Sequence, residues 1–208
     1  MNVLAIGAHP DDIEIGCGGT LAAHARVGDR VMMVVMTAGE MGGASADIRL
    51  KEFANAAKVL GVESTLCLGY PDTRIPRDGT PLTKLDDIVR TFKPDRAYVP
   101  FIREIHQDHR ETAHLALSAC RNISQILMYE GPSTYADFVV TYFSDIADTL
   151  EQKKQAIACH ASQGQKEILK LEAIRSLNRF RGYQSRCDYA EGFAIFRFVD
   201  RFSFVSPV

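Results

Sequence analysis

Short apolar runs alternate with helix-like segments along this chain, and the alternation strongly restricts the possible folds. Residues 3–6 and the valine-rich residues 30–36 each have the length of a buried strand, and residues 18–27 between them have the pattern of a helix. A strand, a helix and a second strand in this order form a right-handed crossover that places the two strands parallel. The chain therefore begins as a doubly wound sheet.

The same alternation continues to the end of the chain. Further helices are predicted at residues 48–60, 82–92, 110–122, 146–159 and 166–181. Further strands are predicted at residues 65–68, 97–99 and 126–129, with an edge strand at 193–199. No repeat or linker interrupts the pattern, and residues 71–81 have the composition of a functional loop. We expect one domain over residues 1–208, with a Rossmann-like, mostly parallel α/β sheet and helices on both faces.

The composition of the chain favours one class of binding partner and one cellular location. Hydrophobic residues make up 46% and charged residues 24% of the 208 residues, which supports a packed core. A formal net charge of −2 gives no reason to expect nucleic acid or an anionic membrane surface as partner, so a small polar ligand is favoured. Five cysteines without a C-x-x-C pair fit neither a disulfide framework nor a thiolate metal site. With no signal sequence and no apolar run long enough to span a bilayer, we expect a cytoplasmic protein.

The first chemical motif is Ala-His-Pro-Asp-Asp at residues 8–12, directly after the first predicted strand. Ligands of open α/β sheets bind outside the carboxyl ends of the strands, which is where this motif falls. His9 and Asp12 carry imidazole and carboxylate groups that suit zinc, and a turn can bring side chains three residues apart toward one ion. The competing interpretation is that Asp11 and Asp12 only cap the following helix.

The second motif is His-Gln-Asp-His at residues 106–109, after the strand predicted to end near Pro100. Either histidine taken alone is compatible with a surface residue or a hydrogen-bonded core residue. Together the two loops supply His9, Asp12 and His109, a set that can hold zinc and leave a position for water. Because no cysteine pair is available to close the site, a catalytic metal is favoured over a structural one.

The remaining polar residues of the two motifs suit the hydrolysis of an amide. Asp11 is the candidate general base for water, and His106 is the candidate acid or oxyanion stabiliser. Asp108 could accept a hydrogen bond from His106 and orient it. Alternatively, Asp108 could support a metal-bound histidine.

The two motifs, with Ile13 and Glu14 after the first, resemble those of the PIG-L or LmbE-like N-acetylglucosaminyl deacetylase family. The segments 37–40, 49–61, 162–163 and 189–193 agree with this resemblance, and its bacillithiol-pathway members look similar. The resemblance implies removal of acetate from an N-acetylglucosamine-type sugar or conjugate, and a homo-oligomer. It implies the same metal ligands, base and acid, and it suggests a set of sugar contacts: Glu40, Arg49 and Asp72. Gln107 replaces a proline that is frequent in the family.

Three alternatives stay open at this point. A metal-dependent amidase could act on another amide conjugate of an amino sugar with the same residues. A magnesium-binding signalling module could also place paired aspartates after its first strand, but the imidazoles of His9 and His109 suit zinc better than magnesium. The ion in the cell could be iron or another divalent metal, because affinity alone does not decide metal selection.

Overall fold

The computed structural model describes residues 1–164 and 170–200 and is built around one sheet. In this part of the chain the sheet has seven strands, in the order β3-β2-β1-β4-β5-β7-β6. Strands β1 to β5 run parallel, and β7 is antiparallel to both of its neighbours. The strands are β1 (Asn2–Gly7), β2 (Arg30–Thr37), β3 (Ser64–Tyr70), β4 (Arg96–Pro100), β5 (Gln125–Tyr129), β6 (Tyr142–Asp145) and β7 (Ala190–Phe198).

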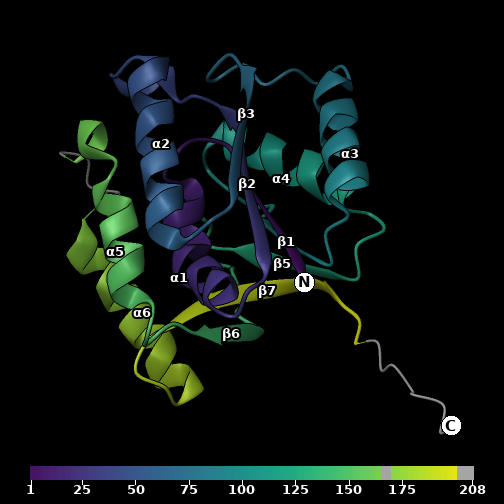
Figure 1. Cartoon of the computed structure of the whole chain (residues 1–208). Coiled ribbons are helices and arrows are strands. Elements are labelled where there is room, and N and C mark those ends of the chain that lie inside the picture. Colours follow the sequence, from purple (N-terminus) through teal and green to yellow (C-terminus); the bar gives the residue numbers. More distant parts are fainter. Residues whose placement is uncertain (165–169, 201–208) are drawn as a thin grey trace, which may run out of the picture.

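Helices cover both faces of this sheet (Figure 1). The helices α1, α2, α5 and α6 lie on one side, and α3 and α4 lie on the other. Two apolar clusters fill the spaces between helices and sheet, one lined by α1, α2 and α5 and the other by α3 and α4. The predicted α/β fold is thereby confirmed. The helices are α1 (Asp12–Arg26), α2 (Ala46–Leu60), α3 (Thr80–Phe92), α4 (Gln107–Ala119), α5 (Leu150–Ala158) and α6 (Leu171–Ser185), with short 3-10 helices η1 (Glu40–Gly42) and η2 (Ala161–Gln163).

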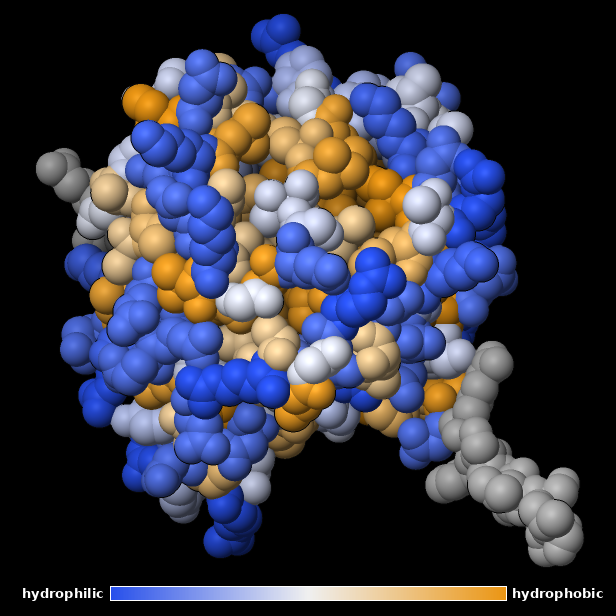
Figure 2. Space-filling model, viewed as in Figure 1, coloured by the Kyte–Doolittle hydropathy of each residue, from blue (hydrophilic) through white to orange (hydrophobic). Residues whose placement is uncertain are grey.

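The ends of α2 show how local sequence sets the bounds of a helix. The Ser45 hydroxyl accepts a hydrogen bond from the Ile48 amide, which caps the first turn. Gly61 then ends the helix with a φ of 75°, a conformation that glycine adopts without steric cost. Figure 2 shows apolar residues exposed between α2 and α3, where β3 forms the edge of the sheet, and Leu66 on that strand is 41% exposed.

Helix α1 begins earlier than the sequence suggests and is kinked. It starts at Asp12 rather than at residue 18, and its regular geometry breaks at Cys17, where φ is −145°. The glycines around this point have low helix propensity, and a side chain at Gly16 would collide with the ring of Tyr129. The kink separates a short first turn, which follows the Ala-His-Pro-Asp-Asp motif, from the remainder of the helix.

A buried ion pair satisfies the backbone groups that the kink leaves without helical partners. The Lys153 ammonium donates to the Ile15 carbonyl oxygen at 2.7 Å and lies 2.6 Å from the Glu191 carboxylate. Glu191 in turn accepts from the amides of Gly19 and Thr20 at 2.9 and 2.8 Å. Lys153 and Glu191 are each 1% exposed, so this pair joins the two parts of α1 inside the protein.

The last third of the chain departs most from the prediction. The strand expected at 193–199 was assigned to the edge, but β7 lies inside the sheet because the unpredicted β6 pairs with its outer side. The helix expected from residue 146 begins at Leu150, since residues 146–149 form a turn. Of the helix expected at 166–181, residues 166–169 lie outside the described residues, and α6 begins at Leu171. The loop expected at 71–81 ends where α3 begins at Thr80.

The order of the strands determines where a ligand site can form. The chain proceeds from β1 to β2 on one side of β1, and β4 pairs with β1 on the other side. The strand order therefore reverses between β1 and β4, which is where ligands bind in open α/β sheets. Both chemical motifs follow these two strands. No helix in the described part of the chain has the length and apolar character that a membrane crossing requires.

Candidate metal centre and active site

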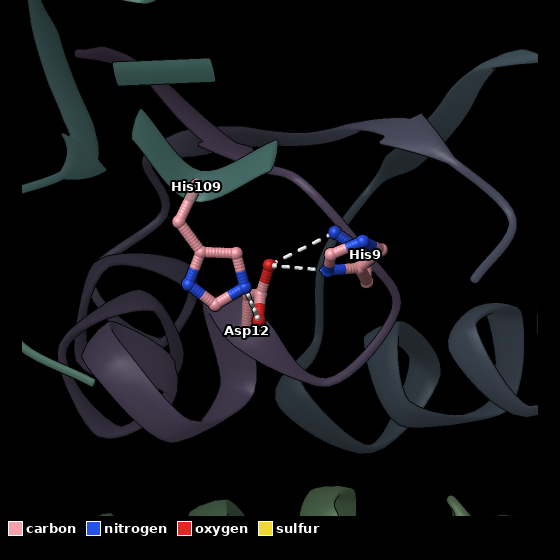
Figure 3. A group of neighbouring side chains, drawn as sticks. All are labelled: His9, Asp12 and His109. Atoms are coloured by element: carbon pink, nitrogen blue, oxygen red, sulfur yellow. Dashed lines mark hydrogen bonds and ion pairs between the residues drawn. The ribbon is translucent and has the colours of Figure 1, made fainter. Parts of the chain in front are cut away.

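The structure brings His9, Asp12 and His109 together at the carboxyl ends of β1 and β4 (Figure 3). His109 Nε2 lies 3.2 Å from one Asp12 oxygen, and His9 Nδ1 lies 3.5 Å from the other. One ligand atom from each residue falls within 4.8 Å of the other two. Two imidazoles and one carboxylate form a donor set that suits zinc and leaves room for water.

Asp12 is fixed by the turn that precedes α1. Its Oδ2 atom accepts hydrogen bonds from the amides of Ala8 and His9 at 3.0 and 2.9 Å. Burial would raise the pKa of this carboxyl, but the neighbouring His109 and His9 rings outweigh that effect and lower its pKa well below the usual value. Asp12 is therefore an anionic candidate ligand that backbone hydrogen bonds hold in place.

The outer nitrogen of His9 lies between two carboxylates. His9 Nε2 is 3.0 Å from Asp72 and 3.2 Å from Asp108. Burial lowers the pKa of His9, but the hydrogen bonds that its ring donates to Asp108, Asp12 and Asp72 raise it well above the usual value. With Nε2 directed at these acceptors, Nδ1 is the nitrogen left to face Asp12 and an ion. In metal sites, a carboxylate that accepts from one imidazole nitrogen orients the ring so that the other nitrogen faces the ion.

Asp108 does not make the hydrogen bond to the His106 ring that the sequence suggested. Its carboxylate accepts from the Thr73 amide at 2.7 Å and contacts His9, and only its backbone amide reaches His106 Nδ1, at 3.2 Å. The reason is the start of α4, where the His106 ring accepts from the Asp108 amide and the Asp108 carboxylate is occupied by His9 and Thr73. The geometry agrees with the alternative in which Asp108 supports a metal-binding histidine.

His106 lines the same cavity, with its ring centroid 4.8 Å from that of His109 and 5.0 Å from that of His9. Because Nδ1 accepts a hydrogen bond from the Asp108 amide, the neutral ring carries its proton on Nε2. Burial and then the nearby His109 and His9 charges lower the pKa of His106. Its Nε2 atom is thus the proton-carrying atom available to a ligand.

Asp11 is buried and adopts an unusual backbone conformation. Its φ of 98° lies in the left-handed region, and the turn directs the carboxylate toward α2 rather than toward the helix amides. Burial and repulsion from Asp12 raise the pKa of Asp11 to about 6, although Arg49 and His160 act in the opposite direction. A carboxylate with this pKa can both accept and release a proton near neutral pH.

The three predicted sugar contacts behave differently in the structure. Arg49 lines the cavity, but its guanidinium is buried and donates to the Pro10 carbonyl oxygen at 2.7 Å and to Asp11 at 3.3 Å. Asp72 also lines the cavity, but its two oxygens already contact His9 and the Met41 amide. Glu40 lies outside the cavity lining and accepts from the Asp72 amide at 3.0 Å. These contacts favour the positioning of other groups over direct contact with a sugar.

A cavity of about 390 Å³ opens over the candidate ligands. Its lining combines the charged cluster with apolar and small residues from helix α1 and from loops. The lining residues are His9, Asp11, Asp12, Ile15, Gly39, Met41, Gly42, Arg49, Asp72, Thr73, His106, His109, Pro132, Ser133 and Gln163.

Sequence reasoning missed two buried groups beside the cluster. Glu104 lies 3.6 Å from His109 Nδ1 and is 1% exposed. His160 bonds Glu14 at 2.8 Å and acts electrostatically on Asp11. Glu104 lies two residues before the second motif, where its acidity could have drawn attention. His160 has no such signal, because it reaches Glu14 from 146 residues away.

Comparison with known families gives a match over more than half of the chain. A family model described as PIG-L, GlcNAc-PI de-N-acetylase, matches residues 4–120. The uncharacterised deacetylase YaiS of Escherichia coli strain K12 is 40% identical over 70% of this chain and 82% of its own length. A probable N-acetyl-α-D-glucosaminyl L-malate deacetylase of Bacillus anthracis is 24% identical, covering 82% of this chain and 85% of its own.

Other relatives show that this fold carries more than one named activity. The N,N'-diacetylchitobiose deacetylase of Pyrococcus horikoshii, solved with an inhibitor, superposes with a TM-score of 0.83 and 33% identity, covering 94% of this chain and 83% of its own. A 4-oxalmesaconate hydratase of Pseudomonas putida is 27% identical over 78% of this chain and 74% of its own. The fold alone therefore does not determine the reaction, which depends on the residues of the site.

Proposed function

Because the chain belongs to the PIG-L family of hydrolytic N-deacetylases, we propose that it uses zinc to hydrolyse the N-acetyl amide of an N-acetylglucosamine-type sugar or sugar conjugate, releasing acetate. The observation that supports this most is the cluster of His9, Asp12 and His109 with Asp11 and His106 on the same cavity. Metal ligands, a base and an acid are the groups that amide hydrolysis needs. Another divalent ion, such as iron, could replace zinc in the cell.

His9 Nδ1, Asp12 and His109 Nε2 would hold the ion. When bound, the metal lowers the pKa of water and polarises the amide carbonyl group. Asp72 and Asp108 accept from His9 Nε2 and keep its other nitrogen directed at the ion. Glu104 lies beside His109 Nδ1 in the same way. The ligand rings are thus oriented by groups that the protein supplies.

Asp11 accepts the proton of the attacking water in this proposal. Arg49 holds the Asp11 carboxylate and keeps its charged form accessible near neutral pH. His106 donates its Nε2 proton to the departing amine, or a hydrogen bond to the oxygen that becomes negative. The Asp108 amide fixes the His106 ring so that Nε2 remains available.

The test is acetate release from a panel of substrates by protein loaded with zinc and by protein treated with a chelator. The panel contains free N-acetylglucosamine, N,N'-diacetylchitobiose, N-acetylglucosaminyl malate and UDP-N-acetylglucosamine. Metal-dependent acetate release supports the proposal and ranks the groups attached to the sugar. A metal-loaded protein that releases no acetate but cleaves another amide conjugate would support the amidase alternative. Hydration of 4-oxalmesaconate without acetate release would place the activity with the hydratase relative instead.

Several expectations about the whole chain accompany this proposal. We propose that residues 1–208 form one deacetylase domain, because both apolar cores pack on the same sheet. A cytoplasmic location and a homo-oligomeric assembly stay predictions. Gel filtration with light scattering would measure the assembly, and fractionation of cells would measure the location.

A further inference from the structure

Glu104 connects a candidate metal ligand to a loop of the cavity. Its side chain is buried between the His109 ring and residues 131–134, which follow β5. One carboxylate oxygen lies 3.6 Å from His109 Nδ1 and accepts from the Ser133 hydroxyl at 2.5 Å. The other oxygen accepts from the Thr134 hydroxyl. The Ser133 hydroxyl is itself 3.4 Å from His109 Nδ1, so these groups form one connected network.

Backbone hydrogen bonds hold the same two segments together. The Ile105 amide donates to the Ser133 carbonyl at 2.9 Å, and the Tyr135 amide donates to the Arg103 carbonyl at 3.1 Å. The Thr134 hydroxyl also accepts from the Gly131 amide at 2.8 Å, which closes the loop on itself. Pro132 and Ser133 line the cavity. A displacement of this loop would therefore move Glu104 relative to His109.

The other candidate metal-binding histidine has the same construction. Asp72 contacts His9 Nε2 with one oxygen and accepts from the Met41 amide of η1 with the other, at 3.0 and 2.9 Å. Glu40, also on η1, accepts from the Asp72 amide. Met41 lines the cavity, as Ser133 does on the opposite loop. Each histidine is thus oriented by a buried carboxylate that also anchors a loop of the cavity.

We propose that Glu104 is a positioning residue that couples the cavity loop 131–134 to the metal ligand His109, and that Asp72 does the same for η1 and His9. A sugar that binds against the loops and an ion that binds the histidines then stabilise each other, because both require the same carboxylate positions. Such coupling is reciprocal by thermodynamic necessity. The inference rests on the proposed function, since it takes His9 and His109 as metal ligands.

The experiment measures zinc affinity by competition with a chelating dye, with and without glucosamine, for the full chain. In the wild type, glucosamine is expected to tighten zinc binding by about fivefold or more. Glu104→Gln keeps the size of the side chain and one oxygen that can accept from a hydroxyl, but it removes the anionic acceptor beside His109. It should weaken zinc binding by about 10- to 100-fold and reduce the effect of glucosamine. The absorption spectrum of the cobalt-substituted protein should change at the same time.

Three further variants separate positioning from a general loss of structure and test the second carboxylate. Ser133→Ala leaves the charge of Glu104 in place but removes its bond to the loop, so it should reduce the glucosamine effect more than it weakens zinc binding without sugar. Glu130→Gln is the matched control, because Glu130 precedes the same loop but pairs with Arg181. It should change neither quantity. Asp72→Asn should weaken zinc binding as Glu104→Gln does.

The outcomes distinguish this inference from the proposed function. A wild-type protein that binds no zinc overturns both. A wild type that binds zinc, with Glu104→Gln and Asp72→Asn binding it equally tightly, overturns the positioning inference alone. A glucosamine effect that is absent from the wild type, or fully retained in Glu104→Gln, overturns the coupling. Circular dichroism of each variant would show whether a weaker affinity reflects a folded protein.

Discussion

The Arg49 guanidinium lies 3.3 Å from the Asp11 carboxylate, and the two side chains are 3% and 6% exposed. This buried pair exists because Asp11 departs from helical geometry and turns its side chain toward α2. Burial and the nearby Asp12 charge raise the pKa of Asp11, and the Arg49 charge limits that rise. A residue that was first expected to contact the sugar therefore limits the proton affinity of the proposed base.

The dependence of activity on pH should show the effect of Arg49 on the pKa of Asp11. A general base works only when deprotonated, so kcat/KM should fall as the pH decreases through the pKa of Asp11, about 6. Arg49→Gln removes a charge that lowers this pKa, so the acid limb should move upward, by roughly one to three pH units. Arg90→Gln, at an exposed arginine of α3 that pairs with Asp87, is the control. An acid limb that stays in place in Arg49→Gln would disprove the pairing as its cause.

Substitution of the proposed base and of a proposed metal ligand should have different effects on zinc content. Asp11→Asn should keep bound zinc and lose turnover by about 10²- to 10⁴-fold, because only proton transfer is removed. His109→Ala should lose the metal as well as the activity. Elemental analysis of the purified variants beside steady-state kinetics measures both. Loss of zinc from Asp11→Asn, or full activity in it, would contradict the division of roles.

His106 should control the opposite side of the pH profile. A general acid works only when protonated, so the rate should fall as the pH rises through the pKa of His106, which the structure lowers from its usual value. His106→Ala should retain zinc and lose this basic limb along with most of kcat. The rate profile of the variant between pH 5 and pH 9 is the measurement, a range chosen as roughly the span over which imidazoles titrate. An unchanged basic limb would remove His106 from the acid role.

The buried pair of Lys153 and Glu191 should dominate the stability of the α1 region. Lys153→Met leaves the Glu191 charge buried without its partner, which costs about 3–5 kcal/mol. Urea unfolding measures the difference from the wild type. Lys154→Met is a close control, because the neighbouring Lys154 pairs with the exposed Glu151 and should change stability by less than about 0.5 kcal/mol. Equal stabilities of the two variants would contradict the role of the pair.

The sequence predicted the parts of the site that depend on position along a strand. His9 and His109 follow the ends of β1 and β4, and parallel neighbouring strands bring their carboxyl ends to the same edge. The partners of Asp72, Asp108 and Glu104 could not be predicted in this way. Their contacts join segments that meet only in three dimensions, such as Asp108 with His9 across 99 residues.

The errors in the fold have a similar origin. The strand β6 has only four residues and no continuous apolar run, so its pairing with β7 is decided by the rest of the sheet. The sequence prediction missed the first turn of α1, and tertiary contacts hold this turn beside glycines of low helix propensity. Local preference predicted the ends of α2 well, because a serine cap and a terminal glycine are both local signals.

The Lys153–Glu191 pair bonds the backbone on both sides of the kink in α1, so the start of the chain depends on residues near its end. Every proposed ligand and catalytic residue lies within residues 4–120, the stretch that the family model matches, but Lys153 and Glu191 lie beyond it. A fragment cut after residue 120 would retain the complete set of reactive groups and leave the Ile15 carbonyl and the Gly19 and Thr20 amides without these partners. Lys153 and Glu191 thus hold α1 in place beside the candidate active site, although neither is a proposed ligand or catalytic residue. Adding the separate remainder of the chain to such a fragment should restore zinc binding, as in a split protein that is reassembled from its halves.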